Sequence, residues 1–135
     1  MTMKRKMPWR NKSPYGWWTA SYIQRFEWKS APPIRPRSRC LAWENTILIH
    51  AKGREAAHGK AIKFAERSAN SKWELLGDPP GRLGRWVLEG LTELLPIYEP
   101  IQDGSEIFWT EYSSAAITTL RRRIKTKGKL GVFQD

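Results

Sequence analysis

Side chains that could carry out catalysis or bind a metal are few in this sequence, and their spacing suits neither task. His50 and His58 are the only histidines, and Cys40 is the only cysteine. A metal site needs three or four ligands, and neither histidine is spaced with Cys40 or a carboxylate as such ligands are. Cys40 and His50 would lie on one strand roughly 33 Å apart, too far for imidazole to activate the thiol. We therefore expect structural roles for these residues and no metal site.

The acidic residues give no stronger indication of an enzyme. Glu106 and Glu111 have opposite parity within one predicted strand, so their carboxylates would point to opposite faces of a sheet. Glu89 and Glu93 could share a face, but charged side chains are common on exposed sheet faces. The glycine-rich stretch 77–84 lacks the Lys-Ser/Thr pair and the following helix of a phosphate-binding loop. The sequence predicts a protein that is not an enzyme and that carries no cofactor.

Positive charge is the dominant feature of the composition. The 135 residues include 24 Lys and Arg against 13 Asp and Glu, for a net charge of +11. Such an imbalance suits a nucleic acid, an anionic membrane surface or an acidic protein partner. Two terminal blocks together hold as many positive charges as the net charge of the whole chain, so the stretch between them is nearly balanced. The blocks are Lys4, Arg5, Lys6, Arg10 and Lys12, and Arg121, Arg122, Arg123, Lys125, Lys127 and Lys129.

Eight tryptophans supply the second unusual feature. Most are expected in the core, but Trp17 shares its strand face with Thr19, Ser21 and Arg25, and we interpret this face as exposed to solvent. An exposed aromatic ring beside arginines is what proteins that bind single-stranded nucleic acid use. The candidate nucleic-acid-binding residues are therefore the two basic blocks, Trp17, and the three arginines of a proline-rich loop, Arg35, Arg37 and Arg39.

Hydrophobic periodicity indicates the elements that must position these residues. We expect strands over 16–28, 40–51, 71–76, 85–98 and 105–113, a main helix over 54–69 and a short basic helix over 115–125. The predicted fold is a single α+β domain, with a twisted, mostly antiparallel sheet of four to five strands and the main helix packed on one face. The predicted organisation is a basic tail at 1–15, the domain at 16–113, and a basic C-terminal helix and tail at 114–135.

Localisation follows from what the sequence lacks. No apolar run is long enough to cross a membrane, and the basic N-terminus is not followed by the apolar segment of a secretory signal. A single cysteine cannot form an internal disulfide. We therefore expect a cytoplasmic protein that does not bind membranes. No small-molecule substrate is apparent from the sequence.

Three stretches of the chain resemble a known family. They are GWWTASY at 16–22, AKGREAA at 51–57 with Ala61 beyond it, and a closing pattern of Gly90-Leu91, Leu94, Pro96-Ile97-Tyr98, Asp103-Gly104-Ser105-Glu106-Ile107 and Trp109. Over about residues 16–112 the chain resembles a bacterial domain family of unknown function that opens with a Trp-(Trp/Tyr)-x-Ala strand. The segment 31–39 and both basic ends depart from that pattern. The family is similar to immunity-like or accessory proteins encoded beside toxin and phage-defence genes, which implies binding to a partner protein.

Two hypotheses follow from the sequence. In the first, this is an accessory or immunity-type protein that binds a partner protein, within a complex that also contains nucleic acid. In the second, the protein itself binds RNA or DNA, largely independently of sequence, through its basic termini and exposed aromatics. The resemblance favours the first hypothesis and the distribution of charge favours the second. We rank the protein partner first by a small margin.

Overall fold

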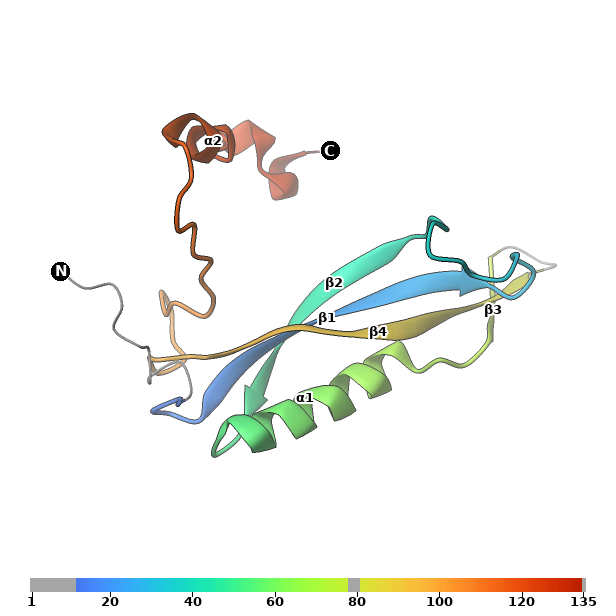
Figure 1. The fold of residues 1–135 in the computed structure, drawn as a ribbon, viewed down its shortest axis with the longest axis horizontal. Coiled ribbons are helices and arrows are strands. Elements are labelled where there is room, and N and C mark those ends of the chain that lie inside the picture. Colours follow the sequence, from blue (N-terminus) through green and yellow to red (C-terminus); the bar gives the residue numbers. More distant parts are fainter. Residues whose placement is uncertain (1–11, 78–80, 135) are drawn as a thin grey trace.

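The computed structural model describes residues 12–77 and 81–134, which form a four-stranded sheet, one long helix and a C-terminal extension (Figure 1). The elements in chain order are β1 (Trp17–Trp28), β2 (Ala42–His50), α1 (Arg54–Ala69), β3 (Glu74–Leu76), β4 (Arg82–Pro96), α2 (Ile117–Arg122), and two 3-10 turns, η2 (Lys127–Lys129) and η3 (Gly131–Phe133). The α+β class, the antiparallel sheet and the helix over 54–69 are confirmed.

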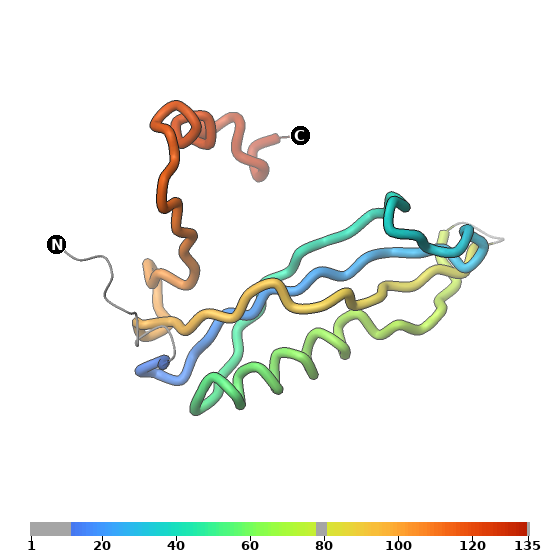
Figure 2. Tube along the Cα trace, in the orientation of Figure 1, coloured from blue at the N-terminus to red at the C-terminus, as the bar shows by residue number. Residues whose placement is uncertain are grey.

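The sheet has the order β2-β1-β4-β3, and every neighbouring pair is antiparallel. β1 is paired with β2 from Trp17 to Arg25 on one side and with β4 from Trp18 to Trp28 on the other, so it forms the centre of the sheet. The pairing of β1 with β4 is irregular between Ser21 and Tyr22 and between Ile23 and Gln24, where β4 carries an extra residue each time. Such bulges increase local twist, and the trace in Figure 2 shows the three long strands coiling around one another.

An alanine stripe allows α1 to pack closely on the sheet. Ala57, Ala61 and Ala65 recur every four residues and are all 0% exposed, which places them on one face of the helix. They pack on a core that includes Trp18 and Ile49, while the indole N–H of Trp18 donates to the carbonyl of Ala51 at 3.1 Å. Phe64, the one aromatic residue of the helix, does not join this stripe and is exposed.

The helix ends where Asn70 adopts a left-handed conformation, with φ of 65°. Its backbone N–H donates to the carbonyl of Glu66, the usual way of closing a helix at such a residue. The 16 residues of α1 span about 24 Å, whereas the 12 residues of β1 span about 40 Å. The helix therefore covers only the half of the sheet that contains Trp18, Ala20 and Tyr22. We call the remainder, from Gln24 to Trp28 with its neighbours on β2 and β4, the distal half (Figure 1).

The prediction for residues 105–113 is wrong, because this stretch is not a strand and is not part of the four-stranded sheet. After Pro96 the chain leaves the sheet and extends away from it to α2 (Figure 1). The bounds of two other expected strands also differ: 71–76 is a strand only from Glu74, and the strand expected over 85–98 is shifted and runs from Arg82 to Pro96. The basic helix expected over 115–125 is confined to α2.

Within residues 12–77 and 81–134, no helix combines the length and the apolar character that a membrane span requires.

Candidate functional site

Four aromatic rings occupy the distal half, on the sheet face that α1 covers elsewhere. We call Phe26, Trp28, Trp43 and Trp86 the distal aromatic cluster. The ring centroids of Phe26 and Trp28 lie 4.8 Å apart, those of Phe26 and Trp86 5.4 Å apart, and those of Trp43 and Trp86 5.0 Å apart. Such separations are typical of favourable aromatic pairs. The rings therefore support one another, and the end of α1 meets them at Asn70, which forms a backbone bridge with Trp86.

Trp43 is the most accessible ring of the cluster. It comes from β2, while Trp86 comes from β4, so the two rings meet across β1 and cover Gln24, which is 7% exposed. Trp43 itself remains 54% exposed. Gly84 allows the Phe26 ring to pack closely against β4, because a Cβ at Gly84 would lie 2.4 Å from that ring. The result is a fixed aromatic surface with one ring open to solvent.

Cations surround this end of the sheet. The guanidinium of Arg82 lies 4.1 Å from the centroid of the Trp28 ring, within the range of a cation–π contact. On the neighbouring segment, the Trp73 ring is approached by Arg85 at 4.2 Å and by the amine of Lys29 at 5.9 Å. Aromatic and positively charged groups are therefore interleaved at the distal end.

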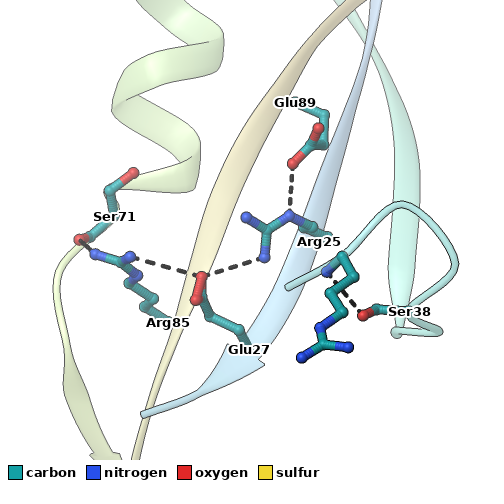
Figure 3. A network of polar contacts seen from close by, with 7 residues as sticks. Arg25, Glu27, Ser38, Ser71, Arg85 and Glu89 are labelled. Carbon is teal, nitrogen blue, oxygen red and sulfur yellow. Dashed lines mark hydrogen bonds and ion pairs between the residues drawn. The ribbon is translucent and has the colours of Figure 1, made fainter. Parts of the chain in front are cut away.

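The opposite face of the distal half is held by a charge network centred on Arg25 (Figure 3). Its Nε donates to Glu89 at 2.5 Å, and its terminal nitrogen donates to Glu27 at 3.1 Å. Arg85 completes the network, at 3.5 Å from Glu27 and 3.5 Å from the carbonyl of Ser71. Burial lowers the pKa of Arg25, but its hydrogen bonds to Glu89 and Glu27 and their negative charges outweigh that effect, so the pKa lies above its ordinary value. Arg25 is thus a permanently charged group fixed by two carboxylates.

This network predicts unequal contributions from its two glutamates. Replacing Glu27 with Gln is expected to lower the free energy of unfolding by about 1.5–3 kcal/mol, because the Glu27 side chain is only 25% exposed, accepts a hydrogen bond from Arg25 and forms an ion pair with Arg85. The matched change Glu89→Gln is expected to cost only about 0–1 kcal/mol, because the Glu89 side chain is 51% exposed. Urea unfolding of the two variants measures both values. Equal losses, or a larger loss for Glu89→Gln, would contradict this description of the network.

The loop between β1 and β2 lies over the same face and encloses an open pocket of about 680 Å³. Its walls include Arg25 and Glu27 on the sheet, Lys29 and Arg39 on the loop, and Trp73. The charges of Arg25 and Arg85 are balanced by Glu27 and Glu89. The loop cations Lys29 and Arg39 therefore give this pocket a net positive charge. An anionic group entering from solvent would therefore meet positive charge at the rim.

Comparison with known proteins identifies the family. The family model described as a domain of unknown function (DUF4288) matches residues 17–109, which is more than half of the chain. The chain belongs to this family. No curated protein matches it, and no solved structure matches it. In this DUF4288 protein the matched region contains the whole distal aromatic cluster, whereas both terminal basic blocks lie outside it.

The prediction that Trp17 lies on a solvent-exposed face is wrong. In this DUF4288 protein Thr19 and Ser21 are 2% and 3% exposed, because β1 is the central strand and has neighbours on both sides. Trp17 is half-buried, and its ring lies 4.7 Å from that of His50. Trp17 therefore lies at the other end of the sheet from the distal aromatic cluster and is not brought together with it.

The predicted basic residues fall into three groups. Lys4, Arg5, Lys6 and Arg10 lie outside the described residues, and Lys12 is exposed. The loop arginines, Arg35, Arg37 and Arg39, are exposed at the distal end of the sheet. The C-terminal residues, Arg121, Arg122, Arg123, Lys125, Lys127 and Lys129, are also exposed, but α2 lies away from the distal half (Figure 1). Only the loop arginines share an end of the sheet with the exposed tryptophan.

The distal aromatic cluster was missed by reasoning from the sequence. Alternation along β1 places Phe26 and Trp28 on the same face as Trp18, and most tryptophans were expected in the core. Length is the signal that could have revealed it, because a 16-residue helix spans about 24 Å and cannot cover a 12-residue strand, which spans about 40 Å. As for other chemistry, Cys40, His50 and His58 are exposed, and the described part of this DUF4288 chain holds no cluster of three or more His, Cys, Asp or Glu suited to a metal ion.

Proposed function

We propose that this protein is a binding module without catalytic activity of its own, and that it binds single-stranded nucleic acid on the distal half of its sheet. The observation that carries the proposal is the Trp43–Trp86 pair. One ring is 54% exposed and the other fixes its position from across the sheet, on a face that the helix leaves open. Unpaired bases stack on aromatic rings presented in this way, each stack contributing about 1–3 kcal/mol.

Neutralisation of phosphates supports the same assignment. Arg82 lies beside the aromatic cluster, whereas Arg35, Arg37 and Arg39 are exposed at the same end of the sheet on a loop that lies over the opposite face. A strand stacked on the cluster would reach these arginines by passing around the end of the sheet. Stacking together with nearby cations is the combination that sequence-tolerant binding of single strands requires. A duplex, whose bases are already stacked on one another, cannot use the tryptophans in this way. We therefore expect single strands to bind more tightly than duplex DNA, with little preference for sequence.

The salt dependence of binding distinguishes which arginines contact phosphates. Replacing Arg35, Arg37 and Arg39 with Ala is expected to flatten the slope of log K against log salt by about two units on single strands, because each lost phosphate contact removes about 0.7. The matched variant replaces Arg121, Arg122 and Arg123, which removes the same charge from a segment distant from the distal half. It should change the slope less. Titrations of mixed-sequence single-stranded RNA and DNA and of duplex DNA, monitored by fluorescence anisotropy, measure both slopes. A larger change in the C-terminal variant would place the phosphate contacts on the extension instead.

A protein partner is the second candidate, and a separate observation favours it. The C-terminal extension, residues 113–134, exposes apolar side chains, among them Ile117, Ile124 and Val132, of which Val132 is 86% exposed. Because basic residues alternate with these apolar ones, an acidic protein surface with an apolar centre would fit the extension. If the extension binds a partner protein, that partner should co-purify with the full chain in a stoichiometric amount even after nuclease treatment. Truncation after residue 112, beyond the family match, should abolish this retention. Retention by the truncated chain would exclude the extension as the docking segment.

A further inference from the structure

The two edges of the sheet are built very differently. β3, at one edge, has only three residues, and short strands are one way in which proteins protect an edge from pairing. β2, at the other edge, has nine residues in unbroken register with β1 and contains no proline and no lysine. A long, regular edge of this kind is a template for a further strand.

The direction of the backbone groups of β2 follows from two hydrogen bonds at its ends. Phe26 N–H donates to the carbonyl of Leu41, and Ala51 N–H donates to the carbonyl of Gly16. Leu41 and Ala51 therefore point their backbone groups toward the β1 side, and the residues between them alternate. The backbone groups directed to the open edge belong to Ala42, Glu44, Thr46, Leu48 and His50. The His50 carbonyl does accept from an outside group, the amine of Lys60 at 2.7 Å.

We propose that β2 pairs in antiparallel fashion with β2 of a second copy of this chain, about a two-fold axis at Thr46. Thr46 is the midpoint of Ala42–His50, so this register pairs all nine residues of the strand and forms the longest ladder available. It also places residues whose backbone groups point to the open edge of one copy opposite the corresponding residues of the other copy, as an antiparallel ladder requires. Any shift along the strand leaves residues at one end of β2 unpaired.

The side chains of β2 are complementary to themselves in this register. Thr46 meets Thr46 of the second copy, a pair that is favourable in antiparallel sheets. Glu44, the one formally charged residue of the strand, lies opposite Leu48, so no like charges face one another. On the other face, Trp43 lies opposite Ile49, an aromatic with a β-branched residue. A register centred on Glu44 would instead place two carboxylates face to face. Charge and packing therefore favour the two-fold at Thr46.

The rest of the fold leaves room for this pairing. α1 packs most extensively on β4, on the far side of β1 from β2. It reaches the open edge through the exposed Lys60 amine, which has to leave the His50 carbonyl when the second strand pairs there. Trp43, Leu41 and Leu48, all on or beside β2, are 54%, 56% and 46% exposed in the single chain. The pairing would continue the sheet across both copies and place two distal aromatic clusters on one surface. The dimer does not depend on the proposed binding of nucleic acid.

Charge placed at the axis tests the proposal directly. Thr46→Lys and Thr46→Glu should each weaken dimerisation by about tenfold or more, because like charges then lie opposite one another at the centre of the interface. An equimolar mixture of the two variants should restore the dimer, because the charges then attract. Sedimentation equilibrium of wild type, each variant and the mixture provides the measurement.

A matched control separates this effect from damage to the fold. The Thr46 hydroxyl is hydrogen-bonded to that of Ser21 at 2.8 Å, and both charged variants lose this bond. Ser21→Ala loses the same bond but adds no charge at the edge, so it should remain as dimeric as the wild type. Circular dichroism confirms that each variant is folded. A monomeric wild-type protein, or a mixture of folded charged variants that stays monomeric, would overturn the proposal.

Discussion

Replacing Trp43 with alanine is expected to weaken the binding of mixed-sequence single-stranded RNA by about 5- to 150-fold, because loss of one stacked base costs about 1–3 kcal/mol. The effect on stability should be small by comparison, since more than half of the Trp43 side chain is already in contact with solvent. Fluorescence anisotropy at fixed salt gives the two affinities, and urea unfolding verifies that the variant is folded.

Trp17→Ala is the matched control for this experiment. It removes the same side chain from a half-buried position at the opposite end of the sheet, where the ring contacts His50. Its affinity for RNA should equal that of the wild type. If instead Trp17→Ala loses affinity and Trp43→Ala does not, the binding surface lies on the strand face first expected from the sequence.

The largest effect on stability is expected from Trp18→Ala, which should lower the free energy of unfolding by about 3–5 kcal/mol. Trp18 is 1% exposed, packs in the core beside the alanines of α1, and satisfies the carbonyl of Ala51. A loss of this size is a large fraction of the stability of an ordinary domain. Urea unfolding monitored by circular dichroism measures it.

A conservative variant separates packing from hydrogen bonding at this position. Trp18→Phe keeps most of the apolar volume but leaves the Ala51 carbonyl without its donor, so it should cost less than Trp18→Ala. If Trp18→Ala is nearly as stable as the wild type, the core does not lie between α1 and the first half of β1.

Local patterns predicted the central part of the fold well. Alternating aromatics predicted β1, and the alanines at helical spacing, followed by Asn70, predicted the bounds of α1. These succeeded because each residue's environment is set by neighbours close in sequence. The position of β1 within the sheet was not predictable in this way. Thr19 and Ser21 look like surface residues, yet central placement buries them.

Other features depended on tertiary context that the pattern does not contain. Residues 105–113 alternate as a strand does, but β-structure needs a partner edge, and the described chain gives this segment none. The network around Arg25 joins residues 64 positions apart in sequence, so no spacing rule indicates it. The distal aromatic cluster is left open because α1 is too short to cover this half of the sheet. This becomes apparent only when the lengths of the helix and the strand are compared.

Photo-crosslinking tests the central claim most directly, because it reports where nucleic acid lies on the protein. Single-stranded RNA carrying iodouridine would be irradiated with the wild-type protein, and the linked peptides mapped by mass spectrometry. We predict crosslinks at Trp43 and Trp86, with neighbouring signals at Phe26 and in the loop that carries Arg35, Arg37 and Arg39. Crosslinks confined to the terminal basic segments, or none at low salt, would contradict the assignment of the distal half as the nucleic-acid-binding surface.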